Sequence, residues 1–272
     1  MKKLKRIIGI GVLVAVVGLA VFGAINRTMA KSEISEVDHL DEFSVDLSNG
    51  NGGNGNGNTD ELVIGTTTPL LDHNISSTPL ALLPVGELDQ NEIDALLFMR
   101  EEEKLARDVY NFLAAHWGLP AFSNIASSEQ THMNIVLDLI NRYELNDSAA
   151  AQAGVFNNAD LQNLYNQLTA QGSLSIEEAF KVGAAIEEID ILDLQLRLPQ
   201  TDQADIQQVF ESLLNGSYNH LNAFVSNLLN RTGVTYVPQY LSTEVYQSIL
   251  SADSTASGSG FGSGSGNGNG RK

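Results

Sequence analysis

Apolar residues recur every three or four positions throughout residues 88–251, the spacing at which side chains share one face of an α-helix. Four long runs of this pattern predict four long helices, which we expect at residues 89–117, 123–143, 175–198 and 201–231. Two shorter runs predict a helical piece at 158–170 and a final turn or two at 243–250.

Residues that begin and end helices flank these runs. Asp89 followed by Glu92, and Ser175 followed by Glu178, match the capping box of a helix N-terminus, and Gly233 is a typical helix end. The result is an all-α fold with a crossover piece between the second and third long helices. This order predicts a four-helix bundle with one long connection, the ferritin-like topology.

The first thirty residues follow a different pattern. Their basic start is followed by an apolar run from Ile7 to Ile25 and the small-residue site Thr28-Met29-Ala30. This order predicts a signal peptide over residues 1–30. The apolar run is also long enough for an uncleaved membrane anchor, so cleavage stays open. Either reading predicts an exported, extracytoplasmic protein whose only membrane attachment is this segment.

Two further segments lack a helical pattern. Residues 31–87 form an acidic arm that contains an Asn/Gly tract at 49–58, and residues 252–272 repeat Gly with Ser and Asn. Such compositions do not build a packed core, so we expect flexible extensions on both sides of a helical domain at 88–251.

The charge balance narrows the range of partners. The chain has 15 Lys and Arg against 33 Asp and Glu, a formal net charge of −18. This acidity argues against nucleic acid and against anionic lipid surfaces, which both attract basic residues. The chain has no cysteine, which excludes disulfides, iron–sulfur clusters and thiolate zinc sites. An exported protein without disulfides needs a sufficient core or a metal.

Each long helix interrupts its apolar face with polar side chains. Glu103 and Tyr110 interrupt the first helix, Glu129 and His132 the second, Glu187 with Asp190 close by the third, and Ser217 and His220 the fourth. Buried ionisable groups are costly unless they are paired or bind an ion, and helical bundles build metal sites from Glu and Glu-x-x-His on facing helices. The pattern therefore predicts a carboxylate–histidine metal site.

Each residue has a simpler interpretation when it is considered alone. Glu129 and His132 would form a solvated surface pair, and Tyr110 and His220 would be ordinary core side chains. Glu103 belongs to an acidic run whose other members, Glu101 and Glu102, we expect on a solvated helix face. The coincidence of four interrupted helices favours the metal site.

Several segments together resemble a known family. The segments are Asn91–Tyr110, with Glu103 seven residues before Tyr110, and residues 128–133, 186–190 and 217–221. They resemble the ferritin-like domain-of-unknown-function family 2202, which is related to the rubrerythrin and erythrin branch of ferritin-like proteins. The resemblance covers about residues 88–250 and implies a ferritin-like bundle with a metal site, but no settled reaction.

The ligand set departs from a full di-iron pattern at one position. Ser217 stands where a second Glu-x-x-His would have its glutamate, so Asp190, or Glu188, would supply the missing carboxylate. The expected cofactor is two ions of iron or manganese, or one ion if the carboxylate is not replaced. The ligand types leave zinc open.

The leading hypothesis is a metal-dependent ferroxidase or peroxidase that reacts with oxygen or peroxide. In it, Glu129 and Glu187 bridge the ions, Glu103 caps one, and His132 and His220 donate nitrogen. Tyr110 would orient a carboxylate through a hydrogen bond. The alternative is a structural or interaction module of the cell envelope with a degenerate or purely structural site. A homo-oligomer is compatible with both.

Overall fold

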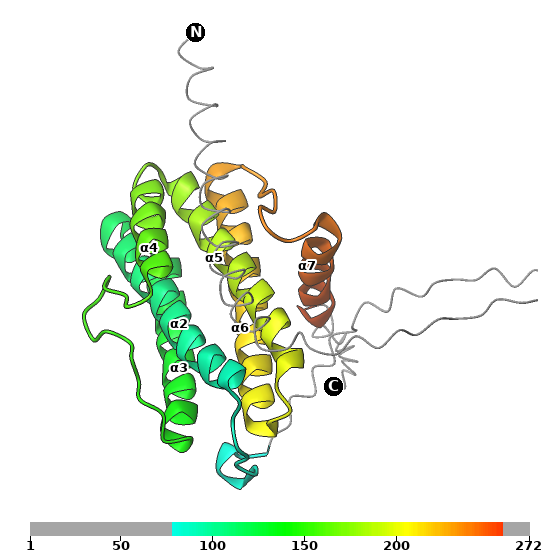
Figure 1. Ribbon diagram of the computed structural model, residues 1–272. Coiled ribbons are helices and arrows are strands. Elements are labelled where there is room, and N and C mark those ends of the chain that lie inside the picture. Colours follow the sequence, from blue (N-terminus) through cyan, green and yellow to red (C-terminus); the bar gives the residue numbers. More distant parts are fainter. Residues whose placement is uncertain (1–77, 258–272) are drawn as a thin grey trace, which may run out of the picture.

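The computed structural model describes residues 78–257, except for the side chains of 253–257, and the regular structure of these residues is entirely helical (Figure 1). The elements are η2 (Leu80–Leu82), α2 (Gln90–Trp117), α3 (Pro120–Arg142), α4 (Ala159–Gly172), α5 (Ile176–Arg197), η3 (Leu198–Gln200), α6 (Ala204–Thr232) and α7 (Thr243–Ser257). The all-α prediction is confirmed. The leader at 1–30, the arm as far as residue 77 and the tail beyond 257 lie outside the described residues.

Local interactions explain most helix ends. Asp89 accepts a hydrogen bond from the Glu92 backbone N–H, and Glu92 accepts one from the Asp89 backbone N–H, both at 2.9 Å. This reciprocal pair is the predicted capping box of α2. Gly118 ends the helix with a φ of 66°, a left-handed conformation that glycine adopts without strain.

Three helix boundaries differ from the prediction by three residues or more. The second long helix begins at Pro120 instead of residue 123, because proline fits the first helical position, where no N–H is needed. The fourth begins at Ala204, three residues later than expected. The last helix, α7, runs on to Ser257, so the expected start of the tail at 252 lies within it.

The long helices pack in two pairs. α2 packs along α3 and α5 along α6, while α4 contacts both α2 and α5 (Figure 1). α5 is the most enclosed element, and residues 182–191 are buried on every side. Among the described residues, no helix is both long and apolar enough to cross a membrane.

Two apolar clusters lie on either side of a polar level in the core. On α2, one cluster includes Leu96 and Met99, and the other begins at Leu105. On α6, the first cluster ends at Leu213 and the second resumes at Leu221. Glu103 on α2, and Ser217 and His220 on α6, fall between the two clusters, so apolar layers that exclude water lie on both sides of this level of the core.

The outer face of α2 is covered by the crossover between α3 and α4. The buried Lys104 ammonium lies 2.7 Å from Asp108 Oδ2 and donates to the carbonyl oxygens of Gln152 and Val155, each at 3.0 Å. Glu101 accepts hydrogen bonds from the backbone N–H groups of Asn157 and Asn158, immediately before α4.

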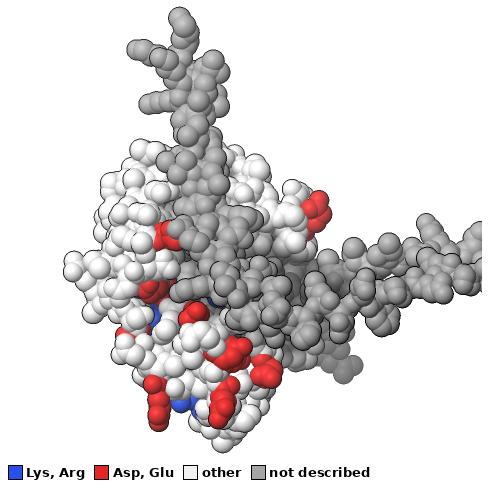
Figure 2. Space-filling model, in the orientation of Figure 1, with Lys and Arg blue, Asp and Glu red and all other residues white. Residues whose placement is uncertain are grey.

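The prediction that Glu101 and Glu102 are solvated was therefore wrong. Each is only 5% exposed, because the crossover and α4 cover this side of α2. Acidic side chains nevertheless prevail over basic ones on the face of the described residues shown in Figure 2.

Candidate metal centre

The seven side chains predicted for the site come from four helices and all are buried. They are Glu103 and Tyr110 on α2, Glu129 and His132 on α3, Glu187 and Asp190 on α5, and His220 on α6. Along their helices, Glu103, Glu129, His132 and His220 lie between the two apolar clusters, whereas Tyr110 belongs to the cluster that begins at Leu105. The structure brings the ionisable members together in two overlapping groups.

The first group consists of Glu103, Glu129 and His132. One ligand atom from each lies within 4.8 Å of the others. His132 Nδ1 is 2.8 Å from Glu129 Oε2 and 3.3 Å from Glu103 Oε2. The three-residue spacing of Glu129 and His132 places both on one face of α3, opposite Glu103 of α2.

The second group consists of Glu129, Glu187 and His220, with ligand atoms again within 4.8 Å of one another. His220 Nδ1 is 2.8 Å from Glu129 Oε1 and 3.5 Å from Glu187 Oε2. Glu129 is thus common to both groups and presents one carboxylate oxygen to each imidazole. His220 Nδ1 and Glu129 Oε1 are close, but neither atom forms a hydrogen bond. The imidazole of His220 and the carboxylate of Glu129 are therefore not aligned for one.

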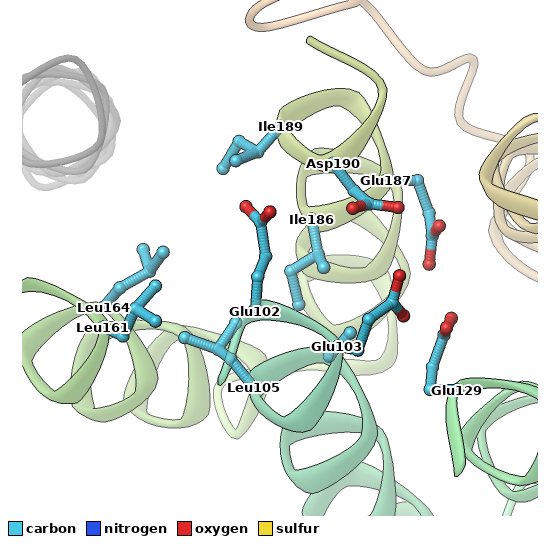
Figure 3. Close-up of a pocket in the computed structure, with 11 residues that line it drawn as sticks. Glu102, Glu103, Leu105, Glu129, Leu161, Leu164, Ile186, Glu187, Ile189 and Asp190 are labelled. Carbon is cyan, nitrogen blue, oxygen red and sulfur yellow. The ribbon is translucent and has the colours of Figure 1, made fainter. Parts of the chain in front are cut away.

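Asp190 is the fourth carboxylate at this level. It follows Glu187 by one helical turn, and Figure 3 shows its carboxylate close to those of Glu187, Glu103 and Glu129. Its Oδ2 accepts a hydrogen bond from Ser217, while its Oδ1 is buried without a partner.

The other carboxylate held in reserve, Glu188, lies elsewhere. It accepts backbone hydrogen bonds from Gln239, Tyr240 and Leu241 in the segment before α7. Of the two reserve residues, the structure therefore places only Asp190 beside the other carboxylates.

Tyr110 touches the second group through its hydroxyl. This hydroxyl donates to Glu187 Oε1 at 2.5 Å, and the side chain is completely buried against Phe224. Burial and the nearby Glu187 carboxylate raise the pKa of Tyr110 well above its ordinary value. Tyr110 is thus a neutral hydrogen-bond donor that fixes one Glu187 oxygen.

The carboxylates have divergent proton affinities. Burial and the neighbouring Asp190 raise the pKa of Glu103 well above its ordinary value. Burial and the Glu187 charge raise the pKa of Asp190 to about 8. Burial also acts on Glu129, but the close contacts of its carboxylate with His132 and His220 outweigh burial and lower the pKa of Glu129 to about 2.

The imidazoles respond in the opposite sense. Burial lowers the pKa of His132, but its contacts with Glu103 and Glu129 prevail and raise it to about 11. Glu187 and Glu129 likewise overcome burial and raise the pKa of His220 to about 10. Without an ion, both histidines are therefore protonated at neutral pH. A metal ion at Nδ1 would replace these protons.

The sequence pattern did not identify two small residues around the histidines. Ser128 Oγ lies 2.9 Å from His220 Nε2, and Gly216 faces the ring of His132. Neither residue type indicates a site by itself. Ser128 directly precedes Glu129, however, and Gly216 directly precedes Ser217, so their neighbours in the sequence were the available signal.

A small cavity adjoins the carboxylates (Figure 3). About 10 Å³ is open to the centre of a water-sized molecule, roughly the space that one water needs. Glu103, Glu129, Glu187 and Asp190 line the side toward the site, and Leu161 and Leu164 of α4 help to close the other. The crossover helix therefore forms part of the wall of the site.

Comparisons with known proteins place the chain in an uncharacterised group. The family profile described as "Uncharacterized protein domain (DUF2202)" matches residues 92–253. Over 176 residues the chain is 45% identical to "Uncharacterized protein MJ0754" of Methanocaldococcus jannaschii, an alignment that covers 64% of this chain and 95% of the relative. The crystal structure of hypothetical protein MJ0754 from Methanococcus jannaschii DSM 2661 resembles this one with a TM-score of 0.60 at 46% identity, covering 62% of this chain and 97% of that chain.

Proposed function

The chain belongs to the DUF2202 family, and we propose that it is an exported ferritin-like protein whose carboxylate–histidine centre binds two ions of iron or manganese. The observation that carries the proposal is the position of Glu129. Its two oxygens each lie 2.8 Å from a different imidazole Nδ1, and each imidazole has a further carboxylate beside it.

The helix arrangement supports the ferritin-like part of the proposal. The α2–α3 pair and the α5–α6 pair are joined by a crossover that includes α4, and each of these four helices contributes to the centre. Glu and Glu-x-x-His on facing helices are the usual ligands of di-iron and di-manganese bundles.

Each ion would have its own carboxylate and nitrogen. Glu103 and His132 would hold one ion, Glu187 and His220 the other, and Glu129 would bridge the two. In this arrangement Glu187 serves one ion, although the sequence suggested it as a second bridge. Asp190 would complete the ligand set.

The unpaired atoms of the site fit a pair of cations. Glu103 Oε1, Glu129 Oε1, Asp190 Oδ1 and His220 Nδ1 are buried without a hydrogen-bond partner. Native proteins rarely leave such atoms unsatisfied, and two ions would satisfy all four. Oxygen and imidazole ligands suit iron and manganese, and they also suit zinc.

Two ions of a redox metal would supply electron transfer to dioxygen or peroxide, which is chemistry of the ferroxidase or peroxidase type. The residues of the chain would provide the surroundings for it. Tyr110 holds Glu187 in place through its 2.5 Å hydrogen bond, and the apolar clusters on both sides exclude bulk water. The candidate leader at 1–30 is the basis for proposing export.

Metal content tests the proposal directly. The protein would be reconstituted with Fe²⁺ or Mn²⁺, and metal per chain measured by mass spectrometry beside the Glu129→Gln variant. We expect two ions per chain in the wild type and at least one fewer in Glu129→Gln. Glu101→Gln is a matched control, because Glu101 is equally buried but faces the crossover. Equal metal content in the wild type and Glu129→Gln would contradict the proposal.

A second candidate function rests on Ser217, which stands where a full di-iron pattern has a carboxylate. In this view the chain is a cell-envelope interaction or structural module, and its metal serves stability alone. Stopped-flow absorbance after mixing the Fe²⁺-loaded protein with dioxygen or peroxide separates the two. Rapid oxidation supports the enzyme, while bound iron that oxidises no faster than free iron supports the module.

A further inference from the structure

Two adjacent residues of α6, Gly216 and Ser217, touch site residues that come from two different helices. Ser217 contacts Asp190 of α5, and Gly216 faces His132 of α3. Neither Gly216 nor Ser217 offers a strong metal ligand of its own, so any role in the site must be exerted through their neighbours.

Ser217 is completely buried and its hydroxyl donates to Asp190 Oδ2. The Ser217 hydroxyl oxygen also lies 2.9 Å from the carbonyl oxygen of Leu213, one helical turn earlier on α6. Asp190 is held by one oxygen, and the other, Oδ1, is left without a partner. Because Asp190 also lines the cavity with Glu103, Glu129 and Glu187, its free oxygen is available at the carboxylate cluster.

Gly216 leaves space that any other residue would fill. A Cβ atom at this position would lie 2.5 Å from His132 Cε1 and 2.6 Å from His132 Nε2. These distances are far inside van der Waals contact, so the ring would have to move. The contact falls on the Cε1–Nε2 edge of the ring, next to Nδ1, which faces Glu103 and Glu129.

We propose that Gly216 and Ser217 are positioning residues of the centre: Ser217 holds Asp190 as the fourth carboxylate, and Gly216 makes room for the His132 imidazole. The proposal rests on the proposed metal-binding function and deepens it. It also explains the departure from the di-iron pattern, because the carboxylate absent from α6 is supplied by α5 and held by the serine that replaces it.

A purely structural role makes a different prediction. If Ser217 only satisfied the Leu213 carbonyl and Gly216 only allowed close packing, their replacement would lower stability and leave metal affinity unchanged. The tests therefore measure Mn²⁺ binding to the folded full-length protein by titration calorimetry, with helicity and thermal unfolding recorded for each variant.

The Ser217→Ala variant removes the hydroxyl. We expect one Mn²⁺ to bind about 10- to 100-fold more weakly, the usual effect of losing a residue that orients a ligand. Ser217→Thr keeps the hydroxyl and should restore binding. Thr169→Ala is the matched control, because it removes a buried hydroxyl bonded to the Tyr165 carbonyl at 2.8 Å on α4. Wild-type affinity in Ser217→Ala would overturn the role of Ser217.

An exchange of the Asp190 and Ser217 side chains gives a second test. It does not require the protein to tolerate the loss of a buried hydroxyl. Asp190→Ser alone should weaken or abolish binding of one Mn²⁺. The double variant Asp190→Ser/Ser217→Asp keeps both side-chain types and moves the carboxylate to α6, so it should regain binding to within about tenfold of the wild type. A double variant that binds no better than Asp190→Ser overturns the pairing.

Gly216→Ala tests the space beside His132. We expect Mn²⁺ affinity to fall about tenfold or more, as the ring is displaced. Gly172→Ala is the control, because its Cβ would lie 2.6 Å from Leu113 Cδ2 in the apolar core. Gly172→Ala should lower stability and leave Mn²⁺ affinity unchanged. Equal effects of the two substitutions on Mn²⁺ affinity would contradict the role of Gly216.

These outcomes separate the inference from the proposed function. If the wild-type protein binds no Mn²⁺ or Fe²⁺, both the proposed metal-binding function and the positioning roles are wrong. A wild type that binds two ions, with Ser217→Ala and Gly216→Ala at wild-type affinity, keeps the metal centre and removes the positioning roles.

Discussion

At the scale of single residues, the free histidines and carboxylates hold each other in charge states that a metal ion would change. His132 and His220 have pKa values raised to about 11 and about 10, whereas the pKa of Glu129 between them is lowered to about 2. The metal-free centre is thus a network of two imidazolium groups around one carboxylate. The stability of the metal-free protein therefore depends on pH.

A pH titration of the metal-free protein tests this network. Raised histidine pKa values give stability that is present below pH 6.5 and lost as the pH rises through about 10 to 11. The raised pKa of Asp190, about 8, also favours the folded state at low pH. This contribution is lost as the pH rises and the carboxyl ionises. The lowered pKa of Glu129 gives stability that is lost as the pH falls from 4.5 toward about 2.

We therefore expect the metal-free protein to unfold at a temperature lower by ~5 °C or more at pH 10 than at pH 6. Mn²⁺ affinity should instead rise from pH 6 to pH 10, because the ion competes with the histidine protons. Calorimetric scans from pH 4 to 10 check both. An unfolding temperature that does not vary between pH 6 and 10 would count against the charge states described for the two histidines.

Tyr110 provides a second prediction at this scale. Tyr110→Phe removes the hydroxyl that donates to Glu187 Oε1 and leaves a buried carboxylate oxygen unsatisfied. We expect a loss of about 1–3 kcal/mol in the free energy of unfolding of the metal-free protein. Weaker binding of one of the two ions should accompany it.

Urea denaturation and Mn²⁺ titration measure these two effects. Tyr236→Phe is the control, since it removes another buried tyrosine hydroxyl, which lies by Glu188 and not by a residue of the centre. Mn²⁺ affinity that falls equally in both variants would argue that Tyr110 acts through general packing.

The sequence pattern identified residues that combine a distinctive type with an inward position. Glu103, Glu129, His132, Glu187 and His220 all lie in the two groups that the structure brings together. Gly216 and Ser128 could not be found in this way, because their role depends on which ring lies opposite them. Glu101 and Glu102 were misassigned because helical spacing does not reveal what covers the outer face of a helix.

At the scale of elements, the buried Lys104–Asp108 pair ties the crossover to α2. Lys104→Met would remove one of the two cations of the buried Asp108, leaving its pair with Arg107, and would remove two bonds to carbonyl oxygens of the crossover. Because two carbonyl oxygens lose their donor, we expect a loss of about 1–3 kcal/mol in the free energy of unfolding. Hydrogen exchange should also rise in residues 144–158.

Lys181→Met is the control for this substitution. Lys181 pairs with Glu177 and Glu178 on α5 and is partly exposed, so its loss should cost less than ~1 kcal/mol. Urea denaturation and hydrogen-exchange mass spectrometry provide the readings. Similar losses in both variants would mean that the crossover does not depend on Lys104.

The helices themselves were largely predictable. The capping box at Asp89 and the glycines at 118 and 233 act within a few residues, so sequence alone places these ends. The length of α7 was underestimated because its packing against α6 involves residues far apart in the chain. The way in which the crossover covers α2 depends on long-range bonds of the same kind.

At the scale of the whole molecule, the polar centre separates two apolar clusters. Every long helix passes from one cluster, through the centre, to the other or close to it. An ion that joins residues of α2, α3, α5 and α6 would therefore link all four helices at the level where apolar packing is interrupted. Binding should stabilise the whole fold and not one helix.

Thermal unfolding with and without Mn²⁺ tests this coupling. A ligand at 100 times its dissociation constant stabilises the folded state by about 2.7 kcal/mol, which corresponds to a rise of roughly 5–10 °C for a domain of this size. The rise should be smaller or absent in Glu129→Gln and persist in full in Glu101→Gln. A rise of equal size in both variants would place the ion elsewhere, for example on the acidic surface.

Anomalous diffraction from crystals of the full-length protein loaded with Mn²⁺ or Fe²⁺ would locate the ions of a two-ion centre. We expect two metal peaks per chain, one bonded to His132 and one to His220, with a Glu129 oxygen on each. A single peak, or peaks that do not share Glu129, would contradict a two-ion centre bridged by this residue.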